Sequence, residues 1–155
     1  MMNTALLETT ATSFREQMSS RALPLLAYWY TSRGDNPVPD RTMFNPYALR
    51  EWLGFISIYQ YDPVRGDFKN RLEGTLITEM TGQDWTGRWA SDVDQSFGST
   101  FLEELAEVHS TATPTIDSVR IYQKKYRTAT KLLMPVAENR QRGADQVFLA
   151  MFPNW

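Results

Sequence analysis

The segment from Gly66 to Arg88, GDFKNRLEGTLITEMTGQDWTGR, constrains the fold more than any other part of the chain. A polar turn opens it, an alternating stretch at Phe68–Glu73 follows, and Thr75–Thr81 then has the pattern of a short helix. Gly82 is the residue type that commonly follows the last turn of a helix. This order predicts a strand that leads into small helices lying against one side of a sheet, in an α+β domain.

Composition excludes several kinds of chemistry and partner. The chain has 155 residues, which fits one domain, and its apolar content of 42% allows a core rich in aromatic side chains. Because it has no cysteine, disulfides, thiolate metal sites, cysteine nucleophiles and cysteinyl flavin adducts are excluded. The net charge of −2 argues against nucleic acid as a partner. No apolar run reaches the roughly 20 residues that span a bilayer, and the first residues lack a basic signal region, so we expect a cytoplasmic protein without membrane contact.

Periodicity and turn residues predict helices first, then two strands, small helices and three strands. The expected helices are 1–22, Leu25–Arg33, Thr75–Thr81 and Gln95–His109, and the expected strands are Leu53–Tyr61, Phe68–Glu73, Pro114–Lys124, Tyr126–Ala137 and Gln146–Phe152. The economical arrangement is a five-stranded antiparallel sheet with helices on one face. Residues 1–22 are then an N-terminal helical extension, and residues 23–155 are the domain.

The two expected strands of the first hairpin differ in pattern. Leu53–Tyr61 is apolar on both faces, which indicates a strand covered on both sides or one whose second face meets the N-terminal helix. In the next strand Phe68 and Leu72 share one face. Its other face carries Lys69, Arg71 and Glu73 and is predicted to be solvated.

Several motifs along residues 24–153 match one known family in order and spacing. They are Tyr28-Trp29, PDRTMFNP at Pro39 to Pro46, Phe68 with Arg71-Leu72 and Gly74-Thr75, GQDWTGR at Gly82 to Arg88, Tyr126, and LLMPV at Leu132 to Val136. In these residues, and in the order of its elements, the chain resembles PAS domains. It is most similar to the PAS-like family found largely as short stand-alone proteins in alphaproteobacteria.

The resemblance implies a sensory or regulatory role in bacterial signalling, with no catalytic residues to carry over and no agreed ligand. We therefore expect a protein that is not an enzyme, that acts through an unknown small molecule or a protein partner, and that forms a homodimer. Binding would shift the population between two packings of the helices on the sheet. Since the chain shows no second output domain, the output is expected to be a protein–protein contact, made by residues 1–22.

The resemblance also indicates where a ligand would bind. PAS-type pockets usually lie in the loop-rich segment beside the sheet, which makes Trp85 and Trp89 the candidate walls of a cavity. Arg71, His109 and Tyr122 complete the candidate ligand-binding residues. One departure from the family pattern is the small and polar run RTATK at 127–131, which makes a cavity against that strand hard to predict.

His109 is the single histidine and ends the predicted helix Gln95–His109. PAS-type domains can ligate haem through a helical histidine. A histidine at a helix C-terminus is also favoured by the helix dipole alone, and we favour that interpretation. No cofactor is predicted, although a haem or a non-covalent flavin stays open.

Acidic side chains are assigned to the surface and to helix caps rather than to a metal site. The helix residues Glu103, Glu104 and Glu107 are predicted to form a solvated face. Asp92 and Asp94 could bind a hard cation, but we favour capping of a helix start. Thr100 and Glu103 have the spacing of a capping box if a helix begins there.

Basic residues cluster near the hairpin that joins the two long strands. They are Arg120, Lys124, Lys125, Arg127 and Lys131, interleaved with Tyr122 and Tyr126. An RNA-binding sheet has this appearance. We favour a solvated or edge-protecting face, because the chain is net acidic.

Two other classes of function remain open. One is a small-molecule enzyme on a cone-shaped α+β fold, of the dehydratase or isomerase type, which needs a paired Asp and His inside a pocket. The other is an interaction module whose core is filled and which has no cavity. The run Gly82–Arg88 lacks the glycine spacing of a phosphate loop, and we expect Asp84 and Thr86 to shape a turn there.

Overall fold

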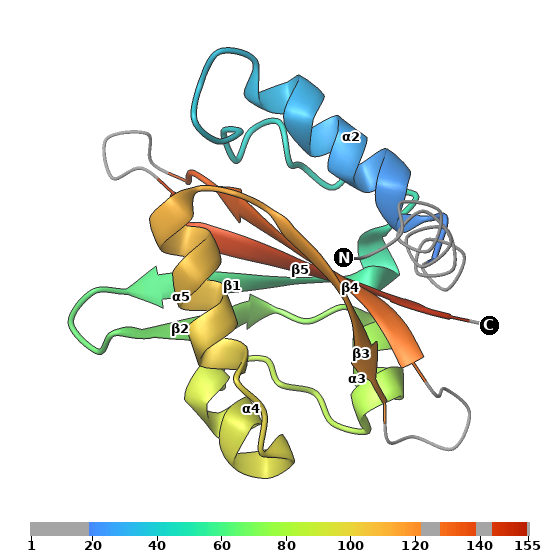
Figure 1. Ribbon diagram of the computed structural model, residues 1–155, viewed down its shortest axis with the longest axis vertical. Coiled ribbons are helices and arrows are strands. Elements are labelled where there is room, and N and C mark those ends of the chain that lie inside the picture. The colour runs from blue at the N-terminus through green and yellow to red at the C-terminus, as the bar shows by residue number, and fades with distance from the viewer. Residues whose placement is uncertain (1–18, 122–127, 139–143, 155) are drawn as a thin grey trace, which may run out of the picture.

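The computed structural model describes residues 19–121, 128–138 and 144–154 (Figure 1). Their helices are α2 (Ala22–Arg33), the 3-10 helix η1 (Leu53–Phe55), α3 (Thr75–Thr81), α4 (Ala90–Phe97) and α5 (Phe101–Thr111). Their strands are β1 (Ile56–Asp62), β2 (Asp67–Leu72), β3 (Thr115–Arg120), β4 (Thr128–Val136) and β5 (Gln146–Pro153).

The five strands form one sheet in the order β2-β1-β5-β4-β3, and every neighbouring pair is antiparallel. The central strand β5 pairs with β1 through Ile58 and Phe148, and with β4 through Leu133 and Leu149. The predicted five-stranded antiparallel α+β fold is therefore confirmed.

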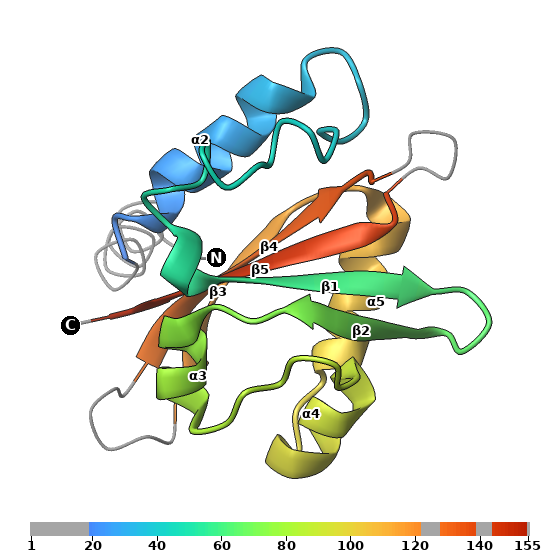
Figure 2. The ribbon, with the colours of Figure 1, turned by 180° about the vertical axis from the view of Figure 1, so that it is seen from behind.

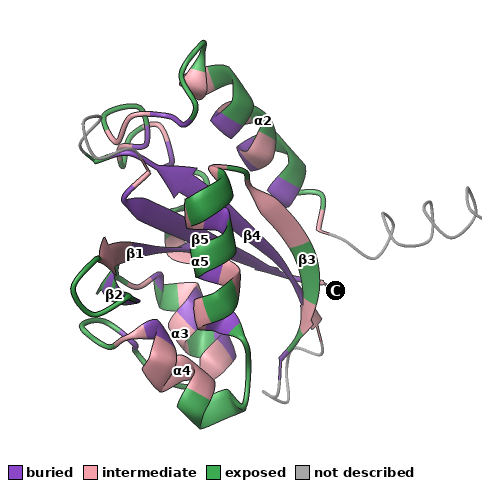
Figure 3. Cartoon of the chain, turned by 60° about the vertical axis from the view of Figure 1, so that its left-hand side comes forward, coloured by how far each residue is buried: buried purple, intermediate pink, exposed green. Residues whose placement is uncertain are grey.

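Alternation along the strands gives the sheet two apolar faces, because successive side chains point to opposite sides. On β5, Phe148 and Phe152 face one core cluster, whereas Val147 and Leu149 face the other. Strands β4 and β5 are consequently buried along almost their whole length (Figure 3).

Different segments cover the two faces. The first face packs against α2 and the segment that follows it; Trp29 of α2 is buried there and donates from Nε1 to the carbonyl oxygen of Pro135 at 2.8 Å. The second face packs against α3, α4 and α5, and α5 lies in front of the sheet in Figure 1 and behind it in Figure 2. A helix on the first face explains why the sequence of β1 is apolar on both sides.

Two predicted elements are divided in the structure. Leu53–Tyr61 begins as the turn η1 and becomes extended only at Ile56. The predicted helix Gln95–His109 is two helices, α4 and α5, because Gly98 adopts a left-handed conformation at φ 63° and ends α4. The helix Thr75–Thr81, followed by Gly82, is confirmed.

Asp94 takes the place of the predicted capping box at the start of α5. Its Oδ1 accepts from the backbone N–H of Phe101 at 2.6 Å, and its Oδ2 accepts from that of Leu102 at 2.9 Å. Thr100 occupies the position before α5 but makes no side-chain capping bond. Asp92 likewise accepts from the backbone N–H of Trp89 at 2.9 Å, so capping by both aspartates is confirmed.

The N-terminal part of the chain is described from Ser19 onward. Helix α2 begins at Ala22 and has Pro24 in its first turn, where a missing N–H is harmless. The predicted extension 1–22, with its contact surface, lies almost wholly outside the described residues. No helix within the described ranges is long and apolar enough to cross a membrane.

Candidate ligand-binding cavity

A cavity of about 370 Å³ lies between the second face of the sheet and the helices α3, α4 and α5. Its apolar floor comes from Leu149 and Met151 of β5, which point to this face by alternation. Ile77 and Met80 of α3 close one side, and Phe97 closes another at the end of α4.

Aromatic rings form much of the remaining wall. Trp85 and Phe97 contact each other with ring centroids 5.8 Å apart, and Tyr59 packs edge-to-face on Phe101 at 5.0 Å. All four side chains line the cavity. Trp85 is 3% exposed and Tyr59 is 2% exposed, so the side chains packed around these two rings hold them in place.

Glu73, next to the end of β2, is a half-buried acid on the wall of the cavity. Its carboxylate accepts from the hydroxyl of Ser57, from the backbone N–H of Trp85 at 3.1 Å and from Nδ2 of Asn70 at 3.4 Å. Burial raises the pKa of the Glu73 carboxyl, while these hydrogen bonds act in the opposite direction. Burial also raises the pKa of the Tyr59 phenol well above its usual range, so Tyr59 is neutral at physiological pH.

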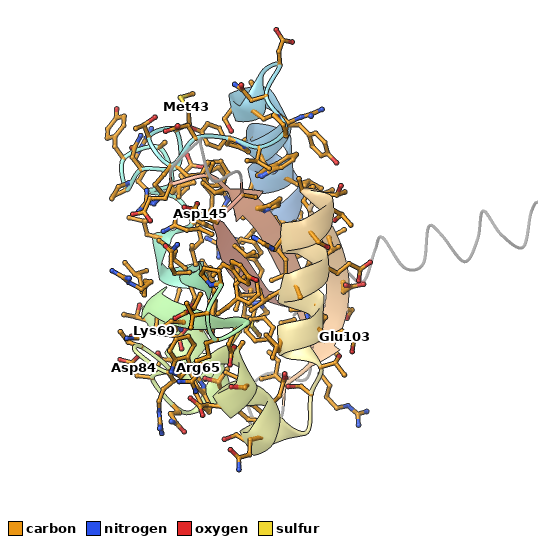
Figure 4. All side chains as sticks on the ribbon, turned by 90° about the vertical axis from the view of Figure 1, so that its left-hand side faces the viewer. Met43, Arg65, Lys69, Asp84, Glu103 and Asp145 are labelled. Atoms are coloured by element: carbon orange, nitrogen blue, oxygen red, sulfur yellow. The ribbon has the colours of Figure 1, made fainter. Side chains whose placement is uncertain are left out.

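An ion pair joins α5 to β4 at another part of the wall. The ammonium of Lys131 donates to Glu104, and the side chains of the two residues are 10% and 32% exposed. Both residues line the cavity. The prediction of a solvated surface was wrong for each of them, whereas Glu103 is exposed and points away from the sheet (Figure 4).

The loop from Gly82 to Arg88 holds Trp85 in place. Asn70 of β2 donates its N–H to the carbonyl oxygen of Arg88 at 2.8 Å and accepts from the N–H of Gly87 at 2.8 Å. Asp84 accepts from the N–H and the hydroxyl of Thr86, at 2.9 and 2.6 Å, and these bonds lower the pKa of the Asp84 carboxyl. The predicted turn is confirmed, and its effect is to press the indole of Trp85 into the protein.

The indole Nε1–H of Trp85 is buried and has no hydrogen-bond partner among the residues that the structure describes. Buried donors in proteins are nearly always satisfied. Because Trp85 also lines the cavity, its unpaired donor is a candidate anchor for a bound molecule.

Of the four predicted ligand-binding residues that the structure describes, one, Trp85, lines the cavity. Trp89 is half-buried outside it, with the guanidinium of Arg65 3.9 Å above its ring. Arg71 is exposed and lines a separate, more polar hollow at the β1–β2 hairpin. Tyr122 lies outside the described residues.

His109 also lies outside the cavity. It stacks on Tyr61 with ring centroids 4.2 Å apart and meets Phe68 edge-on at 5.7 Å. Burial lowers the pKa of the imidazole, and the charge of Asp145 opposes that shift. His109 of α5 thus packs against β1 and β2 through Tyr61 and Phe68.

The histidine has a testable effect on stability. Because the pKa of folded His109 is below its ordinary value of 6.5, its contribution is present above about pH 6.5 and is lost as the pH falls through the folded pKa. We expect His109→Phe, which keeps a ring on Tyr61, to flatten the fall in unfolding free energy between about pH 7 and 5. Urea denaturation at several pH values measures this slope; an unchanged slope would contradict the assignment.

Sequence reasoning missed Glu73, Glu104 and Lys131 as cavity residues. The available signal was strand alternation: Lys131 shares a face of β4 with Ala129 and Leu133, which are both in the second core cluster. No group of three or more His, Asp or Glu side chains that could hold a metal occurs within the described residues.

Comparison with known proteins agrees with this architecture. The family model of the PAS domain matches residues 15–150, which is most of the 155-residue chain. A search of curated proteins finds no match. The five-stranded antiparallel sheet with packed helices is the arrangement that the sequence resemblance implied. The chain belongs to the PAS domain family.

Proposed function

We propose that this PAS domain is a non-catalytic sensory module of a bacterial signalling pathway, and that its signal is a small molecule held in the cavity under α3, α4 and α5. The observation that carries the proposal is the cavity itself, which has about 370 Å³ of space and an aromatic and aliphatic lining. Small-molecule sites typically have roughly 300–1,000 Å³ and a mostly apolar wall with a few polar groups.

Helix α5 can transmit the effect of a bound ligand to the protein surface, because it lines the cavity and is joined to the sheet. Helix α5 contributes Phe101 and Glu104 to the cavity, and Glu104 ties the helix to Lys131 of β4. A molecule that fills the space would favour one position of α4 and α5 on the sheet, and it can shift that equilibrium only by its differential affinity for the two positions. The outer face of α5 is exposed (Figure 3), so a partner protein or a second copy could detect the shift there.

The enzyme alternative requires a histidine and a carboxylate together in the pocket. Among the described lining residues there are two carboxylates, Glu73 and Glu104, and no histidine. Glu73 is occupied by three protein donors and Glu104 by Lys131. This arrangement favours binding over acid–base chemistry.

Blocking the cavity tests the proposal. Val93 of α4 is half-buried and lines the cavity, so Val93→Phe should fill part of it and weaken ligand binding by at least about tenfold. Native mass spectrometry of protein purified from cells should show a bound small molecule in the wild type and little in Val93→Phe.

The matched control is Val64→Phe, at a position in the β1–β2 turn that is 97% exposed. We expect the control to retain the bound molecule. If the wild type has the mass of the bare chain, or if Val93→Phe retains as much ligand as Val64→Phe, the cavity is not the site and the interaction-module alternative gains.

A further inference from the structure

The chemistry of the cavity wall narrows the class of ligand. We propose that the molecule sensed is uncharged and mostly apolar and carries a carbonyl-type oxygen, which accepts a hydrogen bond from the indole Nε1–H of Trp85. This inference rests on the proposed function, because it concerns the occupant of the same cavity.

The first step is the unpaired donor. Trp85 is 3% exposed, and its Nε1 has no partner among the described residues. The buried Trp29 on the other face shows the usual arrangement, since its Nε1 donates to the Pro135 carbonyl oxygen at 2.8 Å. A buried donor left without a partner is costly, so an occupant that supplies the missing acceptor gains affinity.

The second step is the polarity of that anchor. An indole nitrogen donates one hydrogen bond and accepts none. The ligand must therefore present an acceptor to Trp85, and an ammonium group or a plain hydrocarbon cannot satisfy it.

The third step concerns charge. Glu73 lies directly against the Trp85 backbone, with Oε2 3.1 Å from the Trp85 nitrogen. A second carboxylate at this end would be repelled by Glu73. The described lining residues include two cations: Lys131 is paired with Glu104, and Arg120 ends β3, which three strands separate from β2 and the Glu73 end of the cavity. An uncharged acceptor such as a ketone, ester or amide oxygen fits this end of the cavity better than an anion.

The fourth step concerns the rest of the molecule. Apart from these polar groups, the wall is built largely of apolar side chains, among them Ile77, Met80, Phe97, Leu149 and Met151. Such a wall favours a flat or branched apolar body, because burial of apolar surface is the main source of affinity there.

Four naphthalenes of nearly equal size test the inference: 2-acetylnaphthalene, 2-ethylnaphthalene, 2-naphthoate and 2-naphthylmethylammonium. They are titrated into ¹⁵N-labelled full-length protein while the tryptophan indole N–H signals are recorded. We expect 2-acetylnaphthalene to bind most tightly and to move the Trp85 indole proton downfield. Trp85→Phe assigns that signal by its loss.

The same variant gives the affinity readout. Trp85→Phe keeps an aromatic ring and removes the donor. It should therefore lower the affinity for 2-acetylnaphthalene about 3–10-fold and leave the affinity for 2-ethylnaphthalene unchanged. The matched control is Trp89→Phe, at the tryptophan that lies outside the cavity, and it should change neither affinity.

Each other outcome has a defined meaning. If 2-ethylnaphthalene binds as tightly as the ketone, or if 2-naphthoate or the ammonium compound binds best, the inference is overturned while the proposed function stands. An unmoved Trp85 indole signal with a bound ketone has the same meaning. If none of the four compounds binds, the inference is overturned, and the comparison of wild type with Val93→Phe by native mass spectrometry decides the proposed function separately.

Discussion

Replacing Gly74 with alanine is expected to lower the free energy of unfolding by about 3 kcal/mol. A Cβ atom at this position would lie 2.6 Å from the carbonyl oxygen of Gly54, and 2.7 and 2.9 Å from the carbonyl oxygen and nitrogen of Ile56. All three are backbone atoms, so no side chain can move aside. Relief would require β1 to separate from the start of α3.

The control for this prediction is Gly66→Ala in the β1–β2 turn. Gly66 has φ +66°, and no atom lies within 4 Å of the point where an alanine Cβ would sit. Alanine there suffers only the left-handed backbone strain of about 1–2 kcal/mol. Urea denaturation of both variants measures the difference. Equal losses at the two glycines would show that the close approach at Gly74 is not rigid.

The close approach at Gly74 also builds the cavity. The N–H of Gly74 donates to the hydroxyl of Ser57 at 3.3 Å, and that hydroxyl donates to Glu73. The same contact therefore positions the half-buried Glu73 of the cavity wall and the first residues of α3. Loss of ligand binding together with stability is the expected result for Gly74→Ala.

Removing the charge of Glu104 is the second change expected to have a large effect. Glu104→Gln leaves the ammonium of Lys131, whose side chain is only 10% exposed, without its counter-charge. We expect a loss of about 2 kcal/mol in unfolding free energy, below the roughly 3–5 kcal/mol typical of fully buried pairs because Glu104 is 32% exposed. Lys131→Met should cost less, since the carboxylate that remains can still be hydrated.

A double-mutant cycle separates the interaction energy of the Glu104–Lys131 ion pair from the effect of each residue alone. The variant Glu104→Gln with Lys131→Met should be more stable than Glu104→Gln alone, because no uncompensated charge is left. Glu103→Gln, on the exposed side of α5 (Figure 4), is the matched control and should change stability little. Simple additivity of the two single variants would contradict a coupled pair.

The sheet and most of its strands could be predicted because their signals are local. Alternation marks β2, and continuous apolar runs mark β5 and the centre of β4, as expected for strands buried on both faces. The end of α3 was predictable because glycine is the usual residue there. The division of α4 from α5 was missed because the apolar stripe continues from Phe97 to Phe101 across Gly98.

The polar part of the cavity could not be predicted in the same way. Glu104 and Lys131 are 27 positions apart and meet only because α5 crosses β4. Glu73 follows the alternating residues of β2, whose pattern predicted a solvated side chain at this position. In the structure its carboxylate instead accepts a hydrogen bond from the Ser57 hydroxyl. Trp85 was found through the family resemblance, and its unpaired indole nitrogen became visible only in three dimensions.

The position of a bound molecule on the second face of the sheet can be measured in solution. Intermolecular nuclear Overhauser effects can be recorded between 2-acetylnaphthalene and the methionine methyl groups of the labelled protein. We expect contacts to Met80 and Met151, which line the cavity, and none to Met134, which is buried on the opposite face of the sheet. Contacts to Met134 or to the exposed Met43 (Figure 4), with none to Met80 and Met151, would contradict a ligand site in this cavity.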